Sequence, residues 1–303
     1  MTIERIPLDQ YETLGLQPTN VFGSEGFLEL NRLRADEIFL LVADRRLAVV
    51  CGLKDGILCM PWSAPYMTLL TDGNADEADF RLFGQEARKS LGEDRKFKIT
   101  VPAPIYGDAE KHFAEGFLRQ GDRTVADTSF HISLERAVGE ETWNRNQRRN
   151  LRRALEEGLA LESAGIDECY YIIERHHLEH GYRMAMSRQA VHDTARILAA
   201  EFFIVRKDQL PVAAAFCYFV RPDIVQVINS GDTAEGRNYG AMTFLARSLI
   251  DRYRKLLVED KGIKDAVLDY GPTSVDGIQN EGLVRFKTGI GCELTQKYTI
   301  KNV

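Results

Sequence analysis

The clearest pattern of apolar and polar positions along the chain lies in residues 224–253. Apolar residues crowd positions 224–228, as in a strand buried on both faces, and polar residues follow at 229–238. Apolar residues then return at spacings of three and four, which indicates one face of an amphipathic helix: Met242, Leu245, Leu249 and Tyr253. The pattern predicts a buried strand, a polar loop that contains a glycine, and a helix.

Similar patterns predict the remaining elements, in an order that occurs twice. The first half predicts two strands within 37–50, a return strand at 57–59, a helix near 76–90, a strand at 97–101, a helix near 108–120 and a strand at 124–134. The second half predicts a helix at 143–157, a strand at 159–163, helices at 166–179 and 188–200, strands at 202–206 and 212–219, the strand and helix described above, a strand at 266–270 and a tail that ends as a strand. We therefore expect an α/β (α+β) fold of two similar units, each a mixed sheet flanked by helices, with lobes at 1–140 and 141–303 and a boundary near 138–142.

The connection before the helix is a candidate anion site. Arg237 and Gly240 bracket the expected helix start, and such a turn can aim free backbone N–H groups and a helix dipole at a phosphate. The alternative is a solvated connection in which the glycine only permits tight geometry. At the corresponding point of the first half, residues 71–74 include Asp72, which would repel a phosphate. We expect the donor site of that half to be degenerate or reused for substrate.

The net charge and the distribution of apolar residues exclude some classes of binding partner. The chain has 303 residues and a formal net charge of −6, which argues against a surface built as a whole for nucleic acid or an anionic membrane. The first residues lack an apolar signal core, and the longest apolar run, 212–220, is too short to span a bilayer. We expect a cytoplasmic protein with no DNA partner and no membrane insertion. The five cysteines have no metal-site spacing and are interpreted as reduced and structural.

Two clusters of charged or titratable residues have alternative interpretations. Arg145, Arg148, Arg149 and Arg152 share one face of the helix expected at 143–157, which suits an anionic substrate or a tRNA backbone; the alternative is a solvated helix whose arginines pair with acids such as those at 156–157. His176 and His180 stand one helical turn apart, as metal ligands can. Because no further ligand pattern accompanies them, we expect no metal site.

Two stretches resemble the Fem-type transferases of the GNAT superfamily. WNRNQRRNLRRALEEGLALE resembles the arginine-rich helix and following strand that open the second half of that family, and LDYGPTSVDGIQNEGLVRFKTGIG is similar to its Asp-aromatic-Gly strand end followed by a Phe-Lys pair and glycines. The matches fall on residues 143–161, 237–245 and 268–291. The resemblance implies a tandem GNAT fold in which acyl transfer occurs in a cleft between or within the units.

Acyl transfer to an amine requires a held donor carbonyl, N–H groups for the oxyanion and an exit for a proton, which assigns candidate roles. We expect the donor or cofactor at the strand end and the loop: Asn229, Ser230, Arg237, Asn238, Gly240 and Ala241. Asp269 or Tyr270, at the end of the neighbouring strand, could act as acid or base, although Asp269 could instead cap the turn that follows. The resemblance adds Lys287 as a catalytic charge, and it implies contacts to substrate at Phe286 and Tyr182; Arg148 and Arg152 are the candidates on the arginine-rich helix.

These assignments predict an acyltransferase that moves an acyl group, preferably acetyl, from acyl-CoA to the amine of a small or amino-acid-like acceptor. One alternative is a Fem-like transferase that uses aminoacyl-tRNA and acts on a cell-wall or lipid precursor, which the arginine-rich helix favours and the acidic total charge disfavours. A second alternative is a catalytically inert GNAT-like ligand-binding protein.

Overall fold

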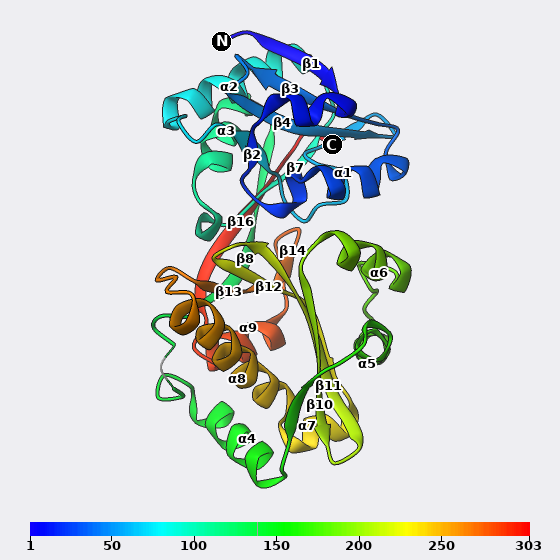
Figure 1. Cartoon of the computed structure of the whole chain (residues 1–303), viewed down its shortest axis with the longest axis vertical. Coiled ribbons are helices and arrows are strands. Elements are labelled where there is room, and N and C mark those ends of the chain that lie inside the picture. The colour runs from blue at the N-terminus through cyan, green and yellow to red at the C-terminus, as the bar shows by residue number, and fades with distance from the viewer. Residues whose placement is uncertain (138) are drawn as a thin grey trace. The chain divides into compact units, whose positions relative to one another are not determined.

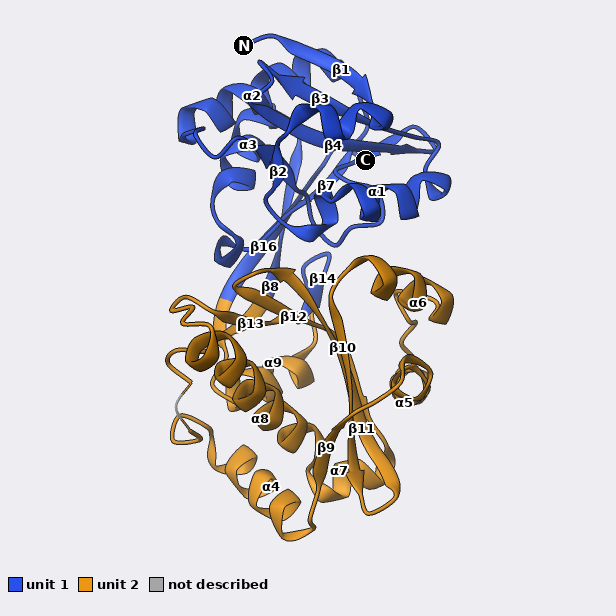
Figure 2. Ribbon diagram, viewed as in Figure 1, with its two compact units in different colours: residues 1–128, 274–278, 295–303 blue, residues 129–273, 279–294 orange. Residues whose placement is uncertain are grey.

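The computed structural model describes residues 1–137 and 139–303 (Figure 1). Unit 1 contains residues 1–128, 274–278 and 295–303, and unit 2 contains residues 129–273 and 279–294 (Figure 2). The C-terminal residues belong to unit 1 because Tyr298–Lys301 pair with Lys98–Val101 there. This differs from the expected lobes, in which residues 141–303 all belonged to the second. Val138, at the expected boundary, lies outside the described residues.

Unit 1 is built on a sheet with the strand order β1-β3-β4-β6-β2. The strands of this sheet are β1 (Ile3–Pro7), β2 (Gln17–Pro18), β3 (Glu37–Ala43), β4 (Leu47–Lys54), β5 (Ile57–Cys59) and β6 (Leu69–Thr71), and β5 pairs with β4. Unit 1 also contains β7 (Lys98–Val101), which pairs with β16 (Glu293–Lys301) in the second sheet. Its helices are α1 (Glu25–Asn31), α2 (Glu77–Leu91) and α3 (Ala109–Phe117). The apolar strands β3 and β4 and aromatic residues of α2 and α3 form one buried core.

The strands of unit 2 follow the order β16-β8-β13-β12-β11-β10-β9. They are β8 (Arg123–Ser133) and β16 (Glu293–Lys301), which have residues in both units, β9 (Ala160–Ser163), β10 (Ala200–Lys207), β11 (Leu210–Arg221), β12 (Ile224–Asp232) and β13 (Val267–Pro272). The helices are α4 (Arg145–Glu156), α5 (Ile166–Glu179), α6 (Arg188–Ile197), α7 (Ala234–Tyr239), α8 (Ala241–Tyr253) and α9 (Glu281–Gly289). A short hairpin of β14 (Ser274–Val275) and β15 (Ile278–Gln279) precedes α9.

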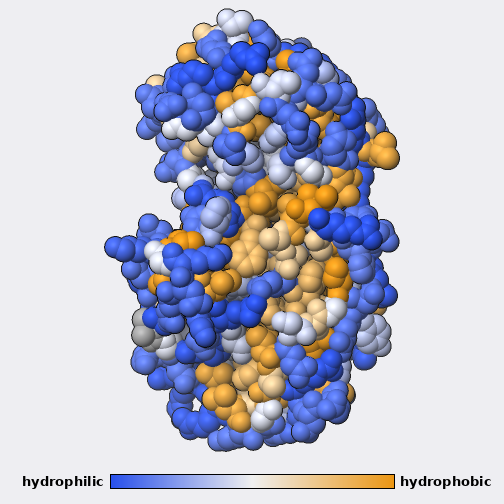
Figure 3. Space-filling view, viewed as in Figure 1, coloured by the Kyte–Doolittle hydropathy of each residue, from blue (hydrophilic) through white to orange (hydrophobic). Residues whose placement is uncertain are grey.

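Helices cover both faces of the unit 2 sheet. α4 and α8 lie on one side of strands β10–β12, and α5 and α6 lie on the other (Figure 1). The α8 residues Leu245, Leu249 and Tyr253 join the buried core, as the spacing of three and four predicted. On the face drawn in Figure 3, apolar residues of unit 2 form a band bordered by hydrophilic residues.

The pairing between β12 and β13 stops early. These two strands run parallel and pair from Ile224 and Val267 to Gln226 and Asp269. Beyond that point β13 continues its antiparallel pairing with β8, and β12 continues along β11 to Asp232, with a bulge at Ile228 between the partners of Phe216 and Cys217. A gap therefore opens between the carboxyl ends of two neighbouring parallel strands, which is where ligands bind in many α/β sheets.

The predicted fold class is confirmed. The chain is an α/β protein, and each unit follows the order strand, helices, antiparallel strands, helix, strand, helix and strand. Two segments differ from expectation. Residues 234–239 form helix α7, capped by the Thr233 side chain, instead of a polar loop, and residues 281–289 form helix α9, capped by Asn280, within a tail expected only to end as a strand.

The cysteines and the helices can be compared with what the sequence predicted about disulfides and membrane spans. All five cysteines are free thiols. In the described part of the chain, no helix combines the length and apolar character needed to cross a bilayer.

Gly240 forms the junction between α7 and α8, with φ of +75°. A Cβ atom there would lie 2.5 Å from the backbone oxygen of Asn150 in α4, so the residue must be glycine both for its conformation and for the approach of α4. By contrast, Gly158 also has positive φ, at +69°, but a Cβ there would meet nothing within 4 Å.

This contrast gives a stability prediction. Gly158→Ala should cost about 1 kcal/mol, which is the conformational term alone. Gly240→Ala should cost about 3 kcal/mol, because backbone atoms must also move. Urea unfolding of the two variants measures the difference, and equal midpoints would show that α4 does not pack on this junction as described.

Candidate functional site

A cavity of about 200 Å³ lies in unit 2, at the gap between the ends of β12 and β13. Six parts of the unit line it: α5, the segment after α5, β12, α8, the end of β13, and α9. The wall formed by α8 is apolar and consists of Met242, Leu245, Ala246 and Leu249. An apolar wall facing a few polar groups is the usual composition of a small-molecule site.

Lys287 on α9 supplies a buried positive charge to the cavity. Its side chain lines the cavity, and the residue is 6% exposed. Nζ donates hydrogen bonds to the backbone oxygens of Tyr270 (2.7 Å), Gly271 (2.9 Å) and Pro272 (3.0 Å). An ammonium group has three N–H donors, so these bonds also fix the end of β13 against α9.

Tyr270 and Asp269 have different surroundings. Tyr270 lines the cavity, and burial raises the pKa of its phenol well above the ordinary value, so the hydroxyl stays protonated. That hydroxyl donates a long hydrogen bond, 3.4 Å, to the Ala246 oxygen. Asp269 is 3% exposed, and its two carboxylate oxygens accept from Gly271 N–H (2.8 Å) and from Gln226 Nε2 (2.9 Å). The hydrogen bond from Gly271 N–H fits the alternative in which Asp269 caps the turn after β13 and does not act as an acid or base.

Asn229 and Ser230 lie on the cavity wall, as expected for the strand end. The side-chain oxygen of Asn229 accepts from the Ser230 N–H at 3.1 Å, and its Nδ2 lies 3.9 Å from the sulfur of Met184. This places a backbone amide and a side-chain amide beside the gap between β12 and β13.

The other expected donor-binding residues lie elsewhere in unit 2. Arg237 is part of α7 and donates to Asp232 Oδ1 (3.1 Å) and to Glu179 Oε2 (2.9 Å), so two carboxylates already hold its guanidinium. Gly240 and Ala241 are buried beside α4, and the Asn238 oxygen accepts from Arg153 at 2.7 Å. Within the described residues, Arg237, Asn238, Gly240 and Ala241 are not part of the cavity lining.

Of the expected substrate contacts, two line the cavity. They are Phe286, beside Lys287 on α9, and Tyr182, which follows α5 and whose hydroxyl accepts from Asn280 Nδ2 at 2.9 Å. Arg148 and Arg152 are exposed on α4 and lie outside the cavity lining in the part of the chain that the structure describes.

The arginines of α4 are not neutralised. Across the described residues, no carboxylate lies within ion-pair distance of Arg145, Arg148, Arg149 or Arg152, and all four are exposed. Glu157, one of the expected acidic partners, pairs instead with Lys207. The expected pairing with acids is therefore wrong for these four arginines, whereas the solvent-exposed helix of the same interpretation agrees with the structure.

The structure also brings together two residues that the sequence did not assign. His176 on α5 lines the cavity, and its Nδ1 lies 3.0 Å from Oδ1 of the buried Asp232. The hydrogen bond to Asp232 raises the pKa of His176 above its ordinary value, while burial and Arg237 oppose the shift. A signal was present in the sequence, because His176 continues the buried apolar stripe of Cys169, Ile172 and Ile173 along α5.

His176 and His180, considered above as metal ligands, have ring centroids 4.4 Å apart, and His180 Nδ1 lies 2.8 Å from the backbone oxygen of His176. The described residues contain no group of three or more side chains suited to hold a metal ion.

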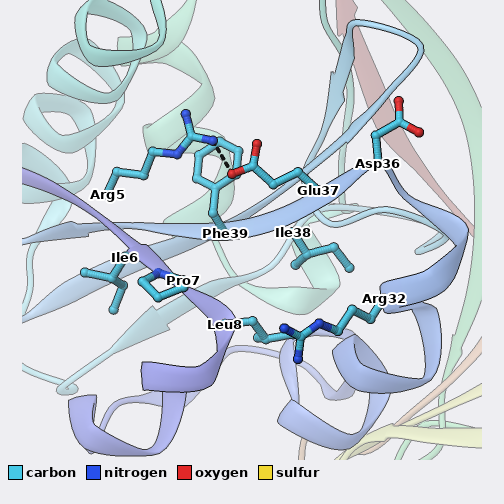
Figure 4. A pocket seen from close by; sticks show the side chains of 9 residues that line it. All are labelled: Arg5, Ile6, Pro7, Leu8, Arg32, Asp36, Glu37, Ile38 and Phe39. Atoms are coloured by element: carbon cyan, nitrogen blue, oxygen red, sulfur yellow. Dashed lines mark hydrogen bonds and ion pairs between the residues drawn. The ribbon is translucent and has the colours of Figure 1, made fainter.

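Unit 1 contains a larger and more open cavity of about 470 Å³ (Figure 4). Arg5 stacks on Phe39, 3.8 Å from the ring centroid, and pairs with Glu37, and Arg32 pairs with Asp9. The two arginines that line this cavity are thus already matched by acids. We therefore place the candidate site in unit 2.

No family model matches the sequence, and no curated protein matches it. Solved structures do match its fold. FemX has 10% sequence identity, with a TM-score of 0.63 over 99% of this chain and 97% of that one. The C-terminal domain of a putative lysylphosphatidylglycerol synthetase from Agrobacterium fabrum has 12% identity, with a TM-score of 0.58 over 91% of this chain and 86% of that one. A tandem GNAT protein from the clavulanic acid biosynthesis pathway has 13% identity and a TM-score of 0.51, over 99% and 98%.

The chain therefore has the Fem-type, tandem GNAT fold, as the resemblance in sequence predicted. The matched region covers nearly the whole of each chain, so both units of this protein have counterparts in those structures. At these identities the likeness concerns the fold alone.

Lys287 offers a test of how the cavity is held together. Lys287→Met should remove the donor for three carbonyls and destabilise the protein by on the order of 3 kcal/mol. Lys264→Met, at an exposed lysine, should change stability by less than about 0.5 kcal/mol. Urea unfolding of both variants checks this, and equal effects would mean that the three bonds do not form in solution.

Proposed function

We propose that the protein is an acyltransferase that transfers an acyl group from an activated donor to an amine in the cavity of unit 2. The observation that carries the proposal is the position of this cavity, at the gap between the ends of two parallel strands, with an apolar wall opposite polar groups. The shared fold with FemX and the tandem GNAT protein supports it.

The lining groups suit the steps of acyl transfer. The apolar α8 wall can hold the acyl chain, and the edge of β12 at Asn229 and Ser230 can align the donor carbonyl next to it. The charge of Lys287 lies in a buried wall, where it stabilises developing negative charge more than it would in water. Tyr270 has a protonated hydroxyl and acts as a donor, not as a base.

The first candidate donor is an acyl-CoA, with acetyl-CoA as the simplest case. Asn229 and Ser230 support it, since both lie where the arm of such a donor would enter the gap. Arg237 would have to leave Asp232 and Glu179 to bind a phosphate of the donor. Asn238, Gly240 and Ala241, which were expected to bind the same phosphate, lie at the junction of α7 and α8.

The second candidate donor is aminoacyl-tRNA, with a cell-wall or lipid precursor as the amine acceptor. A specific observation favours it: α4 exposes Arg145, Arg148, Arg149 and Arg152 on a chain whose net charge is −6, and none of the residues that the structure describes forms an ion pair with them. Exposed guanidinium groups bind phosphates bidentately and by charge, which suits the backbone of an RNA. The resemblance of residues 143–161 and 268–291 to the Fem-type transferases supports this donor as well.

Incubation with single donors tests the proposal. Acetyl-CoA, a longer acyl-CoA and an aminoacyl-tRNA pool should each be offered with two sets of acceptors, a mixture of amino acids and a mixture of amine-bearing cell-wall and lipid precursors, and release of free thiol or deacylation of tRNA measured. Leu283→Trp places an indole at the cavity, so it should slow turnover of the accepted donor; Leu178→Trp, at an exposed leucine outside the lining, should not. A wild-type protein that turns over no donor would refute the acyltransferase.

Thermal stability distinguishes an inert ligand-binding protein from an enzyme. A donor present at about a hundred times its dissociation constant should raise stability by roughly 2.7 kcal/mol. Stabilisation by CoA without turnover would support the inert alternative, and the absence of stabilisation by any CoA would exclude the first candidate donor.

The arginine face of α4 gives a separate prediction for tRNA. Replacing Arg145, Arg148 and Arg152 together by Gln should weaken binding of a tRNA pool and reduce the slope of log affinity against log salt by about 2 to 3, since three phosphate contacts are lost. The matched control replaces Lys255, Lys261 and Lys264, which are also exposed, and changes the net charge equally. Equal effects of the two triple variants would show that only total charge matters.

A further inference from the structure

Gly231 allows α5 to approach β12 closely, which brings His176 to the cavity. A Cβ atom on Gly231 would lie 2.7 Å from the Cβ of His176, closer than side-chain carbons come. His176 thereby lies on the cavity wall beside Asn229 and Ser230, and its side chain keeps 23% of its surface exposed. The imidazole of His176 is therefore half-buried and lies on the wall of a cavity large enough for a small ligand.

The ring of His176 is held from one side by Asp232. Nδ1 lies 3.0 Å from the Asp232 carboxylate, 3.1 Å from the backbone oxygen of the same residue and 3.2 Å from its backbone nitrogen, so three atoms of Asp232 hold this side of the ring. Asp232 is 5% exposed and also accepts from Arg237, whose other arm reaches Glu179. Of the atoms around Nδ1, the buried carboxylate carries the full charge, and it favours the tautomer with the proton on Nδ1 and an unprotonated Nε2.

Nε2 is the nitrogen that a ligand in the cavity can meet. Within the residues that the structure describes, no group makes a hydrogen bond to Nε2 of His176. The cavity also contains Lys287, whose N–H donors are directed at three carbonyls, and Tyr270, whose phenol stays protonated. The lining contains two imidazoles, His176 and His177. Nδ1 of His177 lies 2.9 Å from the backbone oxygen of Ile173, whereas His176 is the one held by a buried carboxylate, which is the arrangement that suits a general base.

We infer that His176, oriented by Asp232, accepts the proton of the attacking amine during acyl transfer in this cavity. The inference rests on the proposed function. The amine nitrogen forms a bond to the donor carbonyl carbon and passes its proton to Nε2 of His176. When the bond from that carbon to the leaving thiol or ribose oxygen breaks, the leaving group takes the bond's electron pair and the proton held on Nε2. One proton thus moves from amine to leaving group, and no other reactant is needed.

The charged surroundings of His176 set the expected pH dependence. Asp232 on β12 raises its pKa, Arg237 on α7 opposes the shift, and Glu179 pairs with Arg237. The other titratable groups near the ring or across the cavity are His177, His180, Tyr182 and Lys287. Only the neutral imidazole accepts a proton, so its reactivity should rise with pH through a midpoint above 6.5. Asp232→Asn removes the raising carboxylate and should lower that midpoint.

Diethyl pyrocarbonate provides a test that needs no substrate, because it modifies an unprotonated ring nitrogen. With peptide mapping by mass spectrometry, His176 of the full chain should be modified at a rate that rises through its midpoint, and Asp232→Asn should shift the midpoint to lower pH. An unreactive His176, or a midpoint that Asp232→Asn leaves unchanged, would overturn the inference.

The second part uses whichever donor the wild-type protein accepts. His176→Ala should lower kcat by about 100- to 10,000-fold with little change in KM, and added imidazole should restore part of the rate. His192→Gln, at a histidine that pairs with Asp167 outside the cavity lining, should keep the wild-type rate. A His176→Ala variant with the wild-type rate and pH profile would refute the role. Failure of the wild-type protein to accept any donor counts against the proposed function alone, since the chemical modification tests His176 independently.

Discussion

The gap between β12 and β13 depends on how the end of β13 is held once its pairing with β12 has stopped. The last parallel pair is Gln226 with Asp269, and the side chains of these same two residues are hydrogen-bonded to each other. Beyond the pair, the ammonium of Lys287 donates hydrogen bonds to three successive carbonyls of β13. One buried cation thus supplies partners to backbone oxygens at the point where the parallel ladder has stopped.

Much of the fold could be predicted from the chain, because its elements have strong periodicity. Helix α5 was predicted with the bounds it has, and α8 buries the stripe that its spacing indicated. The segment after β12 could not be predicted in this way: Thr233 caps a short helix there, and its stability comes from packing and from ion pairs with residues far along the chain. Local polarity indicated a loop, and tertiary contacts formed α7.

The candidate site shows the same division. Asn229, Ser230, Tyr270, Phe286 and Lys287 were assigned from strand ends or from resemblance, and all five line one cavity. Arg237 was assigned from its charge beside a glycine, but a charge pattern cannot show that Asp232 and Glu179 occupy the same guanidinium. His176 was considered only with its neighbour His180 in the sequence, whereas its partner Asp232 lies 56 residues away. Pairings of this kind depend on three-dimensional proximity.

The glycine at position 231 fixes one dimension of the cavity because it has no side chain. The His176 side chain of α5 lies directly over Gly231, so any larger residue at 231 would push this side chain away from β12. The opposite wall is built from four exchangeable side chains of α8. If this chain transfers acyl groups as proposed, substitutions in α8 should change which acyl groups fit the cavity, while the position of the α5 wall stays fixed by Gly231.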